Sequence, residues 1–188
     1  YLVPKLDKDT DWDKAIAGAD VIIHLAARAH QMGKQTNRQQ LEYFTVNEEG
    51  TKKLALAAAN AGVKRFVFIS TIKVNGEKTC GRPFTEDDEP NPNDSYSISK
   101  NNAEKSLLRI HKKTGLELII IRVPLVYGPL VRGNFYSLLW ACFKRRLLPL
   151  KSIRNFRSFL YVENLAAAIT KCVSQPDIES KIYLLSDG

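Results

Sequence analysis

The sequence predicts an α/β protein built on a parallel sheet with helices on both faces. Three short apolar runs of strand length, over residues 19–27, 65–70 and 117–122, alternate with segments in which apolar residues recur at helical spacing. Loops rich in Gly, Pro, Asp and Asn separate these segments. Strands that alternate with helices favour right-handed crossovers, and such crossovers build a parallel sheet that is covered on both sides.

Local patterns support each element of the first half of the chain. Residues 19–27 are predominantly apolar, which is typical of a strand buried on both faces. Over 40–61, apolar residues lie among Glu and Lys at helical spacing, and Gly62 follows as a C-terminal cap. A second buried strand is expected over 65–70, and a loop over 74–94.

The second half continues the alternation. Asp94 or Ser95 is expected to cap a helix that continues to Lys113 and ends at Gly115. Residues 117–122 form the third expected strand. Three further elements are expected: helices over about 134–146 and 162–174, and a strand over 182–185.

Composition restricts the class of protein. With 188 residues, of which 44% are hydrophobic, the chain can bury one sizeable core. No window approaches the roughly 18 consecutive apolar residues of a membrane span, and the first residues lack a signal-peptide pattern. We therefore expect a soluble, cytoplasmic protein without a membrane partner. The net charge of +8 makes a polyanion or a phosphorylated ligand worth considering.

Several other kinds of site are not supported by the sequence. The basic run 144–146 has no aromatic stacking surface or reading helix beside it, so we interpret it as a solvated helix end and expect no nucleic-acid partner. Cys80, Cys142 and Cys172 are odd in number and far from any histidine, which supports neither a disulfide framework nor a metal site. His24 lies inside an apolar strand and is interpreted as a hydrogen-bonded core residue.

The candidate chemistry lies at the carboxyl ends of the strands, where parallel sheets bind ligands. Tyr96 and Lys100 are four positions apart at a predicted helix start, which places both on one face. A phenol with an ordinary pKa near 10 is a poor acid–base group at neutral pH, unless a nearby ammonium stabilises the phenolate. A hydroxyl at the end of the preceding strand, Ser70 or Thr71, would bind the same substrate oxygen. Taken alone, the pair could also be an ordinary surface pair on an amphipathic helix.

The pair is one of six segments that form a series. They are 20–27 with a His-x-Ala-Ala ending, 46–51 with Asn-x-x-Gly-Thr, 66–76, 96–100 with Tyr-x-x-x-Lys, 122–129, and 157–164. In this order they resemble the extended short-chain dehydrogenase/reductases, specifically the nucleotide-sugar epimerase/dehydratase group. The resemblance implies a Rossmann-like doubly wound parallel sheet and NAD, or alternatively NADP, as the cofactor.

The resemblance also implies a catalytic triad of Thr71, Tyr96 and Lys100. The catalytic hydroxyl falls on Thr71 because it lies three positions before Val74, as the family motif requires. Tyr96 would exchange a proton with a sugar hydroxyl, Lys100 would lower the pKa of that phenol and hold the nicotinamide ribose, and Thr71 would orient the oxygen. Hydride would pass between a sugar carbon and the nicotinamide.

Further contacts are implied outside the triad. The cofactor would be bound by Ala26, Ala27, Ser70 and Pro124 besides Tyr96 and Lys100, and the substrate by Asn134 and Arg157 besides Thr71. Arg157 would meet the diphosphate, a role that suits a planar cation with several donors. Packing against a helix explains the two alanines equally well, and a helix cap explains Asn134.

The chain departs from the family at both ends. Nucleotide binding in this fold requires a glycine-rich turn after the first strand, and the ten glycines of this sequence do not have that spacing. We therefore expect the first β-α-β-α unit and most of the C-terminal substrate lobe to be missing. The expected division is an incomplete NAD(P)-binding core over 1–130, and over 131–188 the start of the substrate-binding part with the return to the last strand.

Three functions stay open. The first is an NAD-dependent nucleotide-sugar 4-epimerase of UDP-glucose or UDP-N-acetylglucosamine type in bacterial surface-polysaccharide sugar synthesis. The second is an NAD(P)H-dependent 4-keto-nucleotide-sugar reductase, and the third a non-catalytic fragment or binding domain of the same fold. Dehydration is disfavoured because Ile72 and Lys73 stand where the family's dehydratases carry Asp-Glu. The expected partners are a UDP-hexose or UDP-N-acetylhexosamine and a second copy of the chain, packed through helices 40–61 and 95–113.

Overall fold

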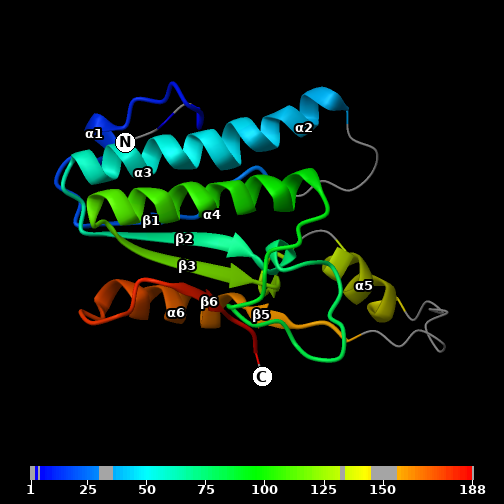
Figure 1. The fold of residues 1–188 in the computed structure, drawn as a ribbon. Coiled ribbons are helices and arrows are strands. Elements are labelled where there is room, and N and C mark those ends of the chain that lie inside the picture. Colours follow the sequence, from blue (N-terminus) through cyan, green and yellow to red (C-terminus); the bar gives the residue numbers. More distant parts are fainter. Residues whose placement is uncertain (1–2, 4, 30–35, 132–133, 145–155, 188) are drawn as a thin grey trace.

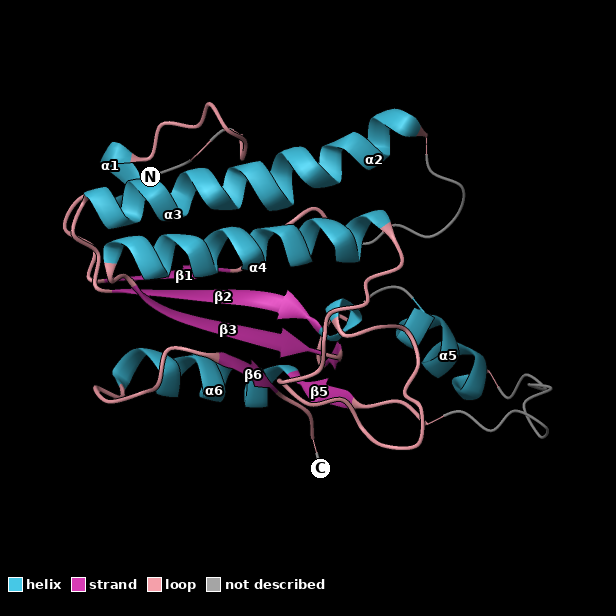
Figure 2. Ribbon diagram, in the orientation of Figure 1, coloured by secondary structure: helices cyan, strands magenta, loops and turns pink. Residues whose placement is uncertain are grey.

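A four-stranded parallel sheet forms the centre of the molecule (Figures 1 and 2). The structure is a computed structural model that describes residues 3, 5–29, 36–131, 134–144 and 156–187. The strands lie in the order β1 (Val21–His24), β2 (Arg65–Thr71), β3 (Glu117–Val123) and β6 (Ile182–Leu184). The α/β class with a parallel sheet is therefore confirmed.

Helices cover both faces of this sheet (Figure 1). One face carries α1 (Asp13–Ile16), a continuous helical run formed by α2 (Asn37–Tyr43), the π-helical segment η1 (Phe44–Gly50) and α3 (Thr51–Asn60), and the long helix α4 (Ser95–Thr114). The other face carries α6 (Val162–Ser174), and α5 (Asn134–Phe143) lies beyond the carboxyl ends of the strands.

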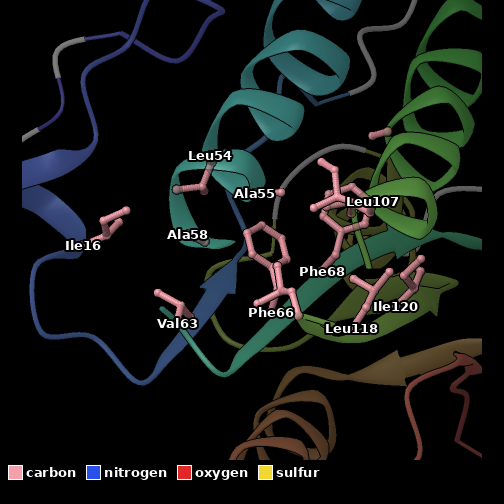
Figure 3. Close-up of a cluster of buried hydrophobic side chains, with 13 residues drawn as sticks. Ile16, Leu54, Ala55, Ala58, Val63, Phe66, Phe68, Leu107, Leu118 and Ile120 are labelled. Atoms are coloured by element: carbon pink, nitrogen blue, oxygen red, sulfur yellow. The ribbon is translucent and has the colours of Figure 1, made fainter. Parts of the chain in front are cut away.

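The two central strands each contain an uninterrupted apolar stretch, 66–69 in β2 and 118–121 in β3, because both of their faces are buried. Contrary to the prediction from sequence, the edge strand β1 is not buried on both faces, since Ile23 is 43% exposed. Phe66, Phe68, Leu118 and Ile120 face α3 and α4, and Figure 3 shows them in the cluster with Leu107. The alternate residues of β2 and β3 point to the opposite face. There they form a second cluster that includes Val67, Ile119, Ile121 and Cys172. Helices on both sides are thus required to bury the two central strands.

Helix α4 begins and ends at the residues that the sequence predicts. The Asp94 carboxylate accepts a hydrogen bond from the Ser97 amide at 2.7 Å, and the Ser97 hydroxyl accepts one from the Asp94 amide at 3.1 Å. This reciprocal capping box satisfies donors that the helix itself cannot. At the other end, Gly115 adopts a left-handed conformation with φ of 75°, which favours glycine.

The structure also differs from the expected elements. The strand expected over 19–27 is shorter, and residues 25–29 form a loop. The helix expected over 40–61 begins earlier, because Thr36 caps α2 in a capping box with Gln39. The sequence analysis does not anticipate a separate parallel pair, β4 (Leu125–Tyr127) with β5 (Phe159–Tyr161), because three-residue strands are too short to show periodicity.

Other expectations meet the limits of the described residues. The helix expected over 134–146 ends at Phe143, and positions 145 and 146 lie outside the described residues. Within the described part of the chain, no helix is both long enough and apolar enough to cross a bilayer. The division at residue 130 stays a prediction.

Candidate active site

Thr71 and Tyr96 meet at the carboxyl end of the sheet. Thr71 is the last residue of β2, and Tyr96 lies in the first turn of α4. Their side chains are hydrogen-bonded to each other. The Thr71 hydroxyl also accepts a hydrogen bond from the backbone amide of Lys73 at 3.3 Å, which fixes its orientation at the start of a single 3-10 turn. The structure therefore brings together the hydroxyl and the phenol that the sequence predicts to act on one oxygen.

Lys100 lies one helical turn further along α4 and points toward β2. Its ammonium donates to the carbonyl oxygen of Ile69 at 2.7 Å and lies 3.9 Å from the centre of the Phe68 ring. Only 2% of the residue is exposed. Burial lowers the pKa of Lys100 to about 7, although the negative charge of Glu104 acts in the opposite direction.

The pKa of Tyr96 differs from the sequence expectation. Burial, followed by the negative charge of Asp94, raises it to about 12, and the hydrogen bond with Thr71 lowers it only in part. The lowering of this pKa that is expected from Lys100 is not found, and the Lys100 ammonium donates to the Ile69 carbonyl instead. The phenol of this structure therefore keeps its proton at neutral pH.

Asn47 connects the loop after β1 to helix α4. Its amide accepts from the Arg28 backbone N–H at 2.8 Å and donates to the Arg28 carbonyl at 3.2 Å. The same amide donates to the Ser99 hydroxyl at 3.0 Å, and Ser99 donates to the Tyr96 carbonyl at 2.7 Å. Asn47 lies in the π-helical segment η1, and such segments are frequent at functional sites. The loop that contains Ala26 and Ala27 is thereby held beside the start of α4.

The remaining predicted residues occupy different environments. Ala26 and Ala27 are exposed beyond the end of β1, and Pro124 is half-buried between β3 and β4. Ser70 is buried, and its hydroxyl donates to the Glu104 carboxylate inside the protein. Asn134 is the first residue of α5, but its side chain lies outside the described part. Arg157 is exposed just before β5.

A buried ion pair lies directly behind these residues and is not identified by the sequence analysis. The Arg122 guanidinium donates to the Glu104 carboxylate at 2.6 Å, and 2% of each side chain is exposed. Helical spacing contains a signal for it, because Lys100, Glu104 and Leu107 fall on the same inward face of α4. A carboxylate on an apolar helix face indicates a buried partner.

His24 is a hydrogen-bonded core residue, as the sequence analysis expects. Its Nε2 lies 2.8 Å from the Thr51 hydroxyl, and its ring stacks on Phe68 with centroids 5.6 Å apart. Burial, and secondarily the charge of Lys100, lowers the pKa of His24 to about 3. The imidazole is therefore neutral at physiological pH.

Comparison with known proteins decides the family. A sequence model of the NAD dependent epimerase/dehydratase family matches residues 4–185. The chain belongs to this family. The UDP-glucose 4-epimerase of Vibrio cholerae is 42% identical over 190 residues, which cover 100% of this chain and 58% of that protein. The N-acetyl-alpha-D-glucosaminyl-diphospho-ditrans,octacis-undecaprenol 4-epimerase of Escherichia coli O157:H7 is 32% identical and covers 84% of this chain and 46% of that protein.

Solved structures of epimerases have the same fold. The UDP-glucuronic acid 4-epimerase of Bacillus cereus, in complex with UDP-glucuronic acid and NAD, superposes with a TM-score of 0.84 at 25% identity. The match covers 96% of this chain and 58% of that one. Relative to these members of the epimerase/dehydratase family, the chain is thus a partial Rossmann-like domain that spans about half of their length.

The described residues fit one end of the NAD that such structural relatives bind. An ammonium carries three hydrogens, and within the described part of the chain Lys100 donates one of them to the Ile69 carbonyl. This buried cation can therefore still donate to hydroxyl groups such as those of a ribose. The exposed Ala26 and Ala27 add little bulk at the end of β1. A glycine-rich turn for the pyrophosphate is not present in the sequence.

Proposed function

We propose that this chain carries the catalytic residues of an NAD-dependent UDP-sugar 4-epimerase. The observation that carries the proposal is the hydrogen bond between Thr71 and Tyr96 at the carboxyl end of β2. Identity of 42% with the Vibrio cholerae UDP-glucose 4-epimerase supports a UDP-hexose as the substrate, with a UDP-N-acetylhexosamine as the related choice. This chain spans 58% of that relative, so the activity is proposed for the polypeptide that the gene encodes.

The proposed mechanism assigns one task to each residue of the triad. Lys100, with Ala26 and Ala27 at the end of β1, would hold the nicotinamide end of NAD, which would supply the hydride chemistry when bound. The Tyr96 phenol is protonated in this structure, so it would first give up that proton. Its phenolate oxygen would then receive the proton of the sugar hydroxyl and give it back from the same atom. Thr71 donates to that hydroxyl oxygen and holds it within reach of the phenol. Lys100 donates to the ribose and contributes a positive charge that favours the phenolate of Tyr96.

The loop after β2 favours epimerisation over dehydration. At the two positions after Thr71, where the family's dehydratases carry Asp-Glu, this chain has Ile72 and Lys73. The Lys73 ammonium donates to the Asp94 carboxylate at 2.6 Å, so it is held by the N-terminal cap of α4. Loss of water from a sugar requires a general acid and base at this place, and an apolar residue with a paired cation supplies neither.

Two further properties of the protein are part of the proposal. A homodimer is proposed through the helices on the α4 side of the sheet, where Leu41 and Leu56 are exposed to 65% and 41%. A cytoplasmic location is proposed because UDP-sugars are the expected substrates. Sedimentation of the gene product would measure the first property directly.

An activity assay tests the proposed reaction. The gene product is incubated with NAD and UDP-glucose or UDP-N-acetylglucosamine, and the 4-epimer and NADH are quantified. We expect epimer without net formation of NADH, and a loss of kcat on the order of 10²–10⁴-fold in Tyr96→Phe. Tyr183→Phe in β6 is the matched control, because its hydroxyl donates to the Glu179 carbonyl in the loop before that strand. Net consumption of NADH or NADPH with a 4-keto sugar would indicate the reductase instead, and full activity of Tyr96→Phe would exclude the proposed mechanism.

A further inference from the structure

Glu104 and Arg122 form the buried ion pair that lies behind Thr71, Tyr96 and Lys100. The Arg122 side chain donates three hydrogen bonds to Glu104, from Nη2 to Oε2 at 2.6 Å and from Nε to Oε1 and Oε2 at 3.1 and 3.2 Å. Only 2% of each side chain is exposed. A fully buried ion pair is costly to desolvate, and the same volume filled by apolar residues is often equally stable or more so. Stability alone therefore does not account for charges at this position.

The Glu104 carboxylate connects the three elements that carry the site. It accepts a hydrogen bond from the Ser70 hydroxyl, so it holds the residue that directly precedes Thr71 in β2. Its partner Arg122 belongs to β3 and also donates to the Asn75 side chain at 2.9 Å. Asn75 in turn donates to the Thr85 carbonyl at 2.9 Å, which fixes the loop after β2. A single carboxylate of α4 thus organises β2, β3 and that loop.

Glu104 also faces Lys100 from the next turn of the same helix. Its negative charge raises the pKa of Lys100 against the effect of burial. Among the described residues, the other groups that surround this ammonium carry no negative charge. They are the neutral imidazole of His24 in β1, the Phe68 ring and Ile69 carbonyl of β2, and the protonated phenol of Tyr96 in α4.

We propose that Glu104 is a positioning residue of this site, which holds the Thr71 end of β2 through Ser70 and places a buried negative charge one helical turn from Lys100. Its role in catalysis rests on the proposed epimerase function, whereas its effect on Lys100 does not. Arg122 balances the negative charge of Glu104, and its three hydrogen bonds keep the carboxylate from turning toward Lys100. The cluster as a whole therefore leaves the site with one net positive charge.

The first test measures the ionisation of Lys100 without any catalysis. Lysine side chains of the 188-residue chain are labelled with ¹³C at Cε and titrated by NMR, and Lys100→Arg identifies the Lys100 signal. In Glu104→Gln we expect the midpoint of Lys100 to fall by about one pH unit, because an opposite charge at this range contributes that much. Glu104→Asp retains the charge and should restore most of the shift. An unchanged midpoint in Glu104→Gln would overturn the proposal.

Controls separate this effect from damage to the fold. Glu117→Gln breaks another ion pair between an arginine and a glutamate, Arg65 with Glu117 at 2.7 Å, which is partly exposed and lies at the opposite end of the sheet. It should leave the midpoint of Lys100 unchanged. Glu104→Gln leaves the Arg122 charge buried without its partner and can unfold the chain. In that case the double variant Glu104→Gln/Arg122→Met is titrated, since it removes both charges. A smaller fall of the Lys100 midpoint is expected there, because loss of the Arg122 charge acts in the opposite direction to loss of the Glu104 charge.

The second test uses the pH dependence of the gene product. If catalysis requires Lys100 to be charged, the high-pH limb of the kcat/KM profile should move to lower pH in Glu104→Gln. The size of this shift should equal the fall of the Lys100 midpoint measured by NMR. Glu117→Gln should keep the wild-type profile. If the gene product is an active epimerase, but Glu104→Gln moves neither the high-pH limb of kcat/KM nor the Lys100 midpoint, then the role of Glu104 is disproved and the proposed function stands. An inactive gene product in which the Lys100 midpoint still falls would disprove the proposed function and leave the effect of Glu104 on Lys100 intact.

Discussion

The Lys73 ammonium donates to the Asp94 carboxylate at 2.6 Å, and this pair joins the loop after β2 to the first turn of α4. Asp94 has two further tasks, because it caps α4 through Ser97 and its charge acts on Tyr96. Burial opposes ionisation of Asp94, but hydrogen bonds from Lys73 and Ser97 hold its pKa below the usual value. Asp94 therefore carries a negative charge at neutral pH, and this charge acts on the Tyr96 phenol.

Asp94→Asn should lower the pKa of Tyr96 from its raised value of about 12. Asn caps a helix as well as Asp does, so α4 keeps its start while the negative charge beside the phenol disappears. We expect the ¹³Cζ signal of Tyr96 in tyrosine-labelled protein to begin its titration about one pH unit earlier. Asp88→Asn removes a carboxylate that pairs with Arg82 in the loop, and it serves as the control. An identical Tyr96 titration in both variants would contradict this prediction.

Thr71→Val should have the opposite effect on the same phenol. The substitution keeps the β-branched shape but removes the hydroxyl whose hydrogen bond favours the Tyr96 phenolate. The onset of Tyr96 ionisation should move to higher pH, and kcat of the gene product should fall on the order of 10²-fold. Thr71→Ser retains a hydroxyl and should recover most of both properties. Equal behaviour of the valine and serine variants would exclude a role for this hydroxyl.

The sequence predicts the fold and the meeting of Thr71 with Tyr96, but it does not reveal the electrostatics of the site. Strand ends and a helix start can be located from apolar periodicity and capping residues, and these place both side chains at one edge of the sheet. The pKa of a phenol depends instead on burial and on charges such as that of Asp94. Burial and neighbouring charges follow from tertiary packing, which cannot be deduced from the four-residue spacing of Tyr96 and Lys100.

Contacts between distant segments are equally hidden in the sequence. Asn47 belongs to a segment that resembles the family motif, yet its hydrogen bonds to Arg28 and Ser99 depend on how η1 packs against α4. Glu104 and Arg122 meet across 18 positions of sequence, from a helix and a strand. The helical spacing of Glu104 predicts that it is buried, but its partner can be found only from the sheet.

Lys100→Met should stabilise the fold, and the gain should depend on pH. The pKa of Lys100 is about 7 in the folded chain against an ordinary 10.5, so between these values the unfolded chain binds more protons than the folded one. Wild-type stability therefore rises with pH across this window. We expect Lys100→Met to have a free energy of unfolding higher by on the order of 1–3 kcal/mol below about pH 7, with the difference shrinking toward pH 10.5.

Urea unfolding at a series of pH values measures this difference. Lys105→Met, on the exposed side of the same helix, is the matched control and should show a difference that does not vary with pH. A Lys100→Met variant that is less stable than wild type below neutral pH would contradict the depressed pKa of Lys100.

His24→Gln should make the fold less sensitive to acid. The pKa of His24 is lowered to about 3 by burial, whereas an unfolded histidine titrates near 6.5. Between these values the unfolded chain binds one more proton, so wild-type stability falls as the pH falls from about 6.5 toward 3. Gln can retain the hydrogen bond to Thr51 without titrating, so the free energy of unfolding of His24→Gln should decline less over this range.

His111→Gln is the control, because that ring lies at the end of α4 against the Leu116 carbonyl. Parallel pH profiles for wild type and His24→Gln, measured by urea unfolding, would show that protonation of this imidazole does not drive acid unfolding.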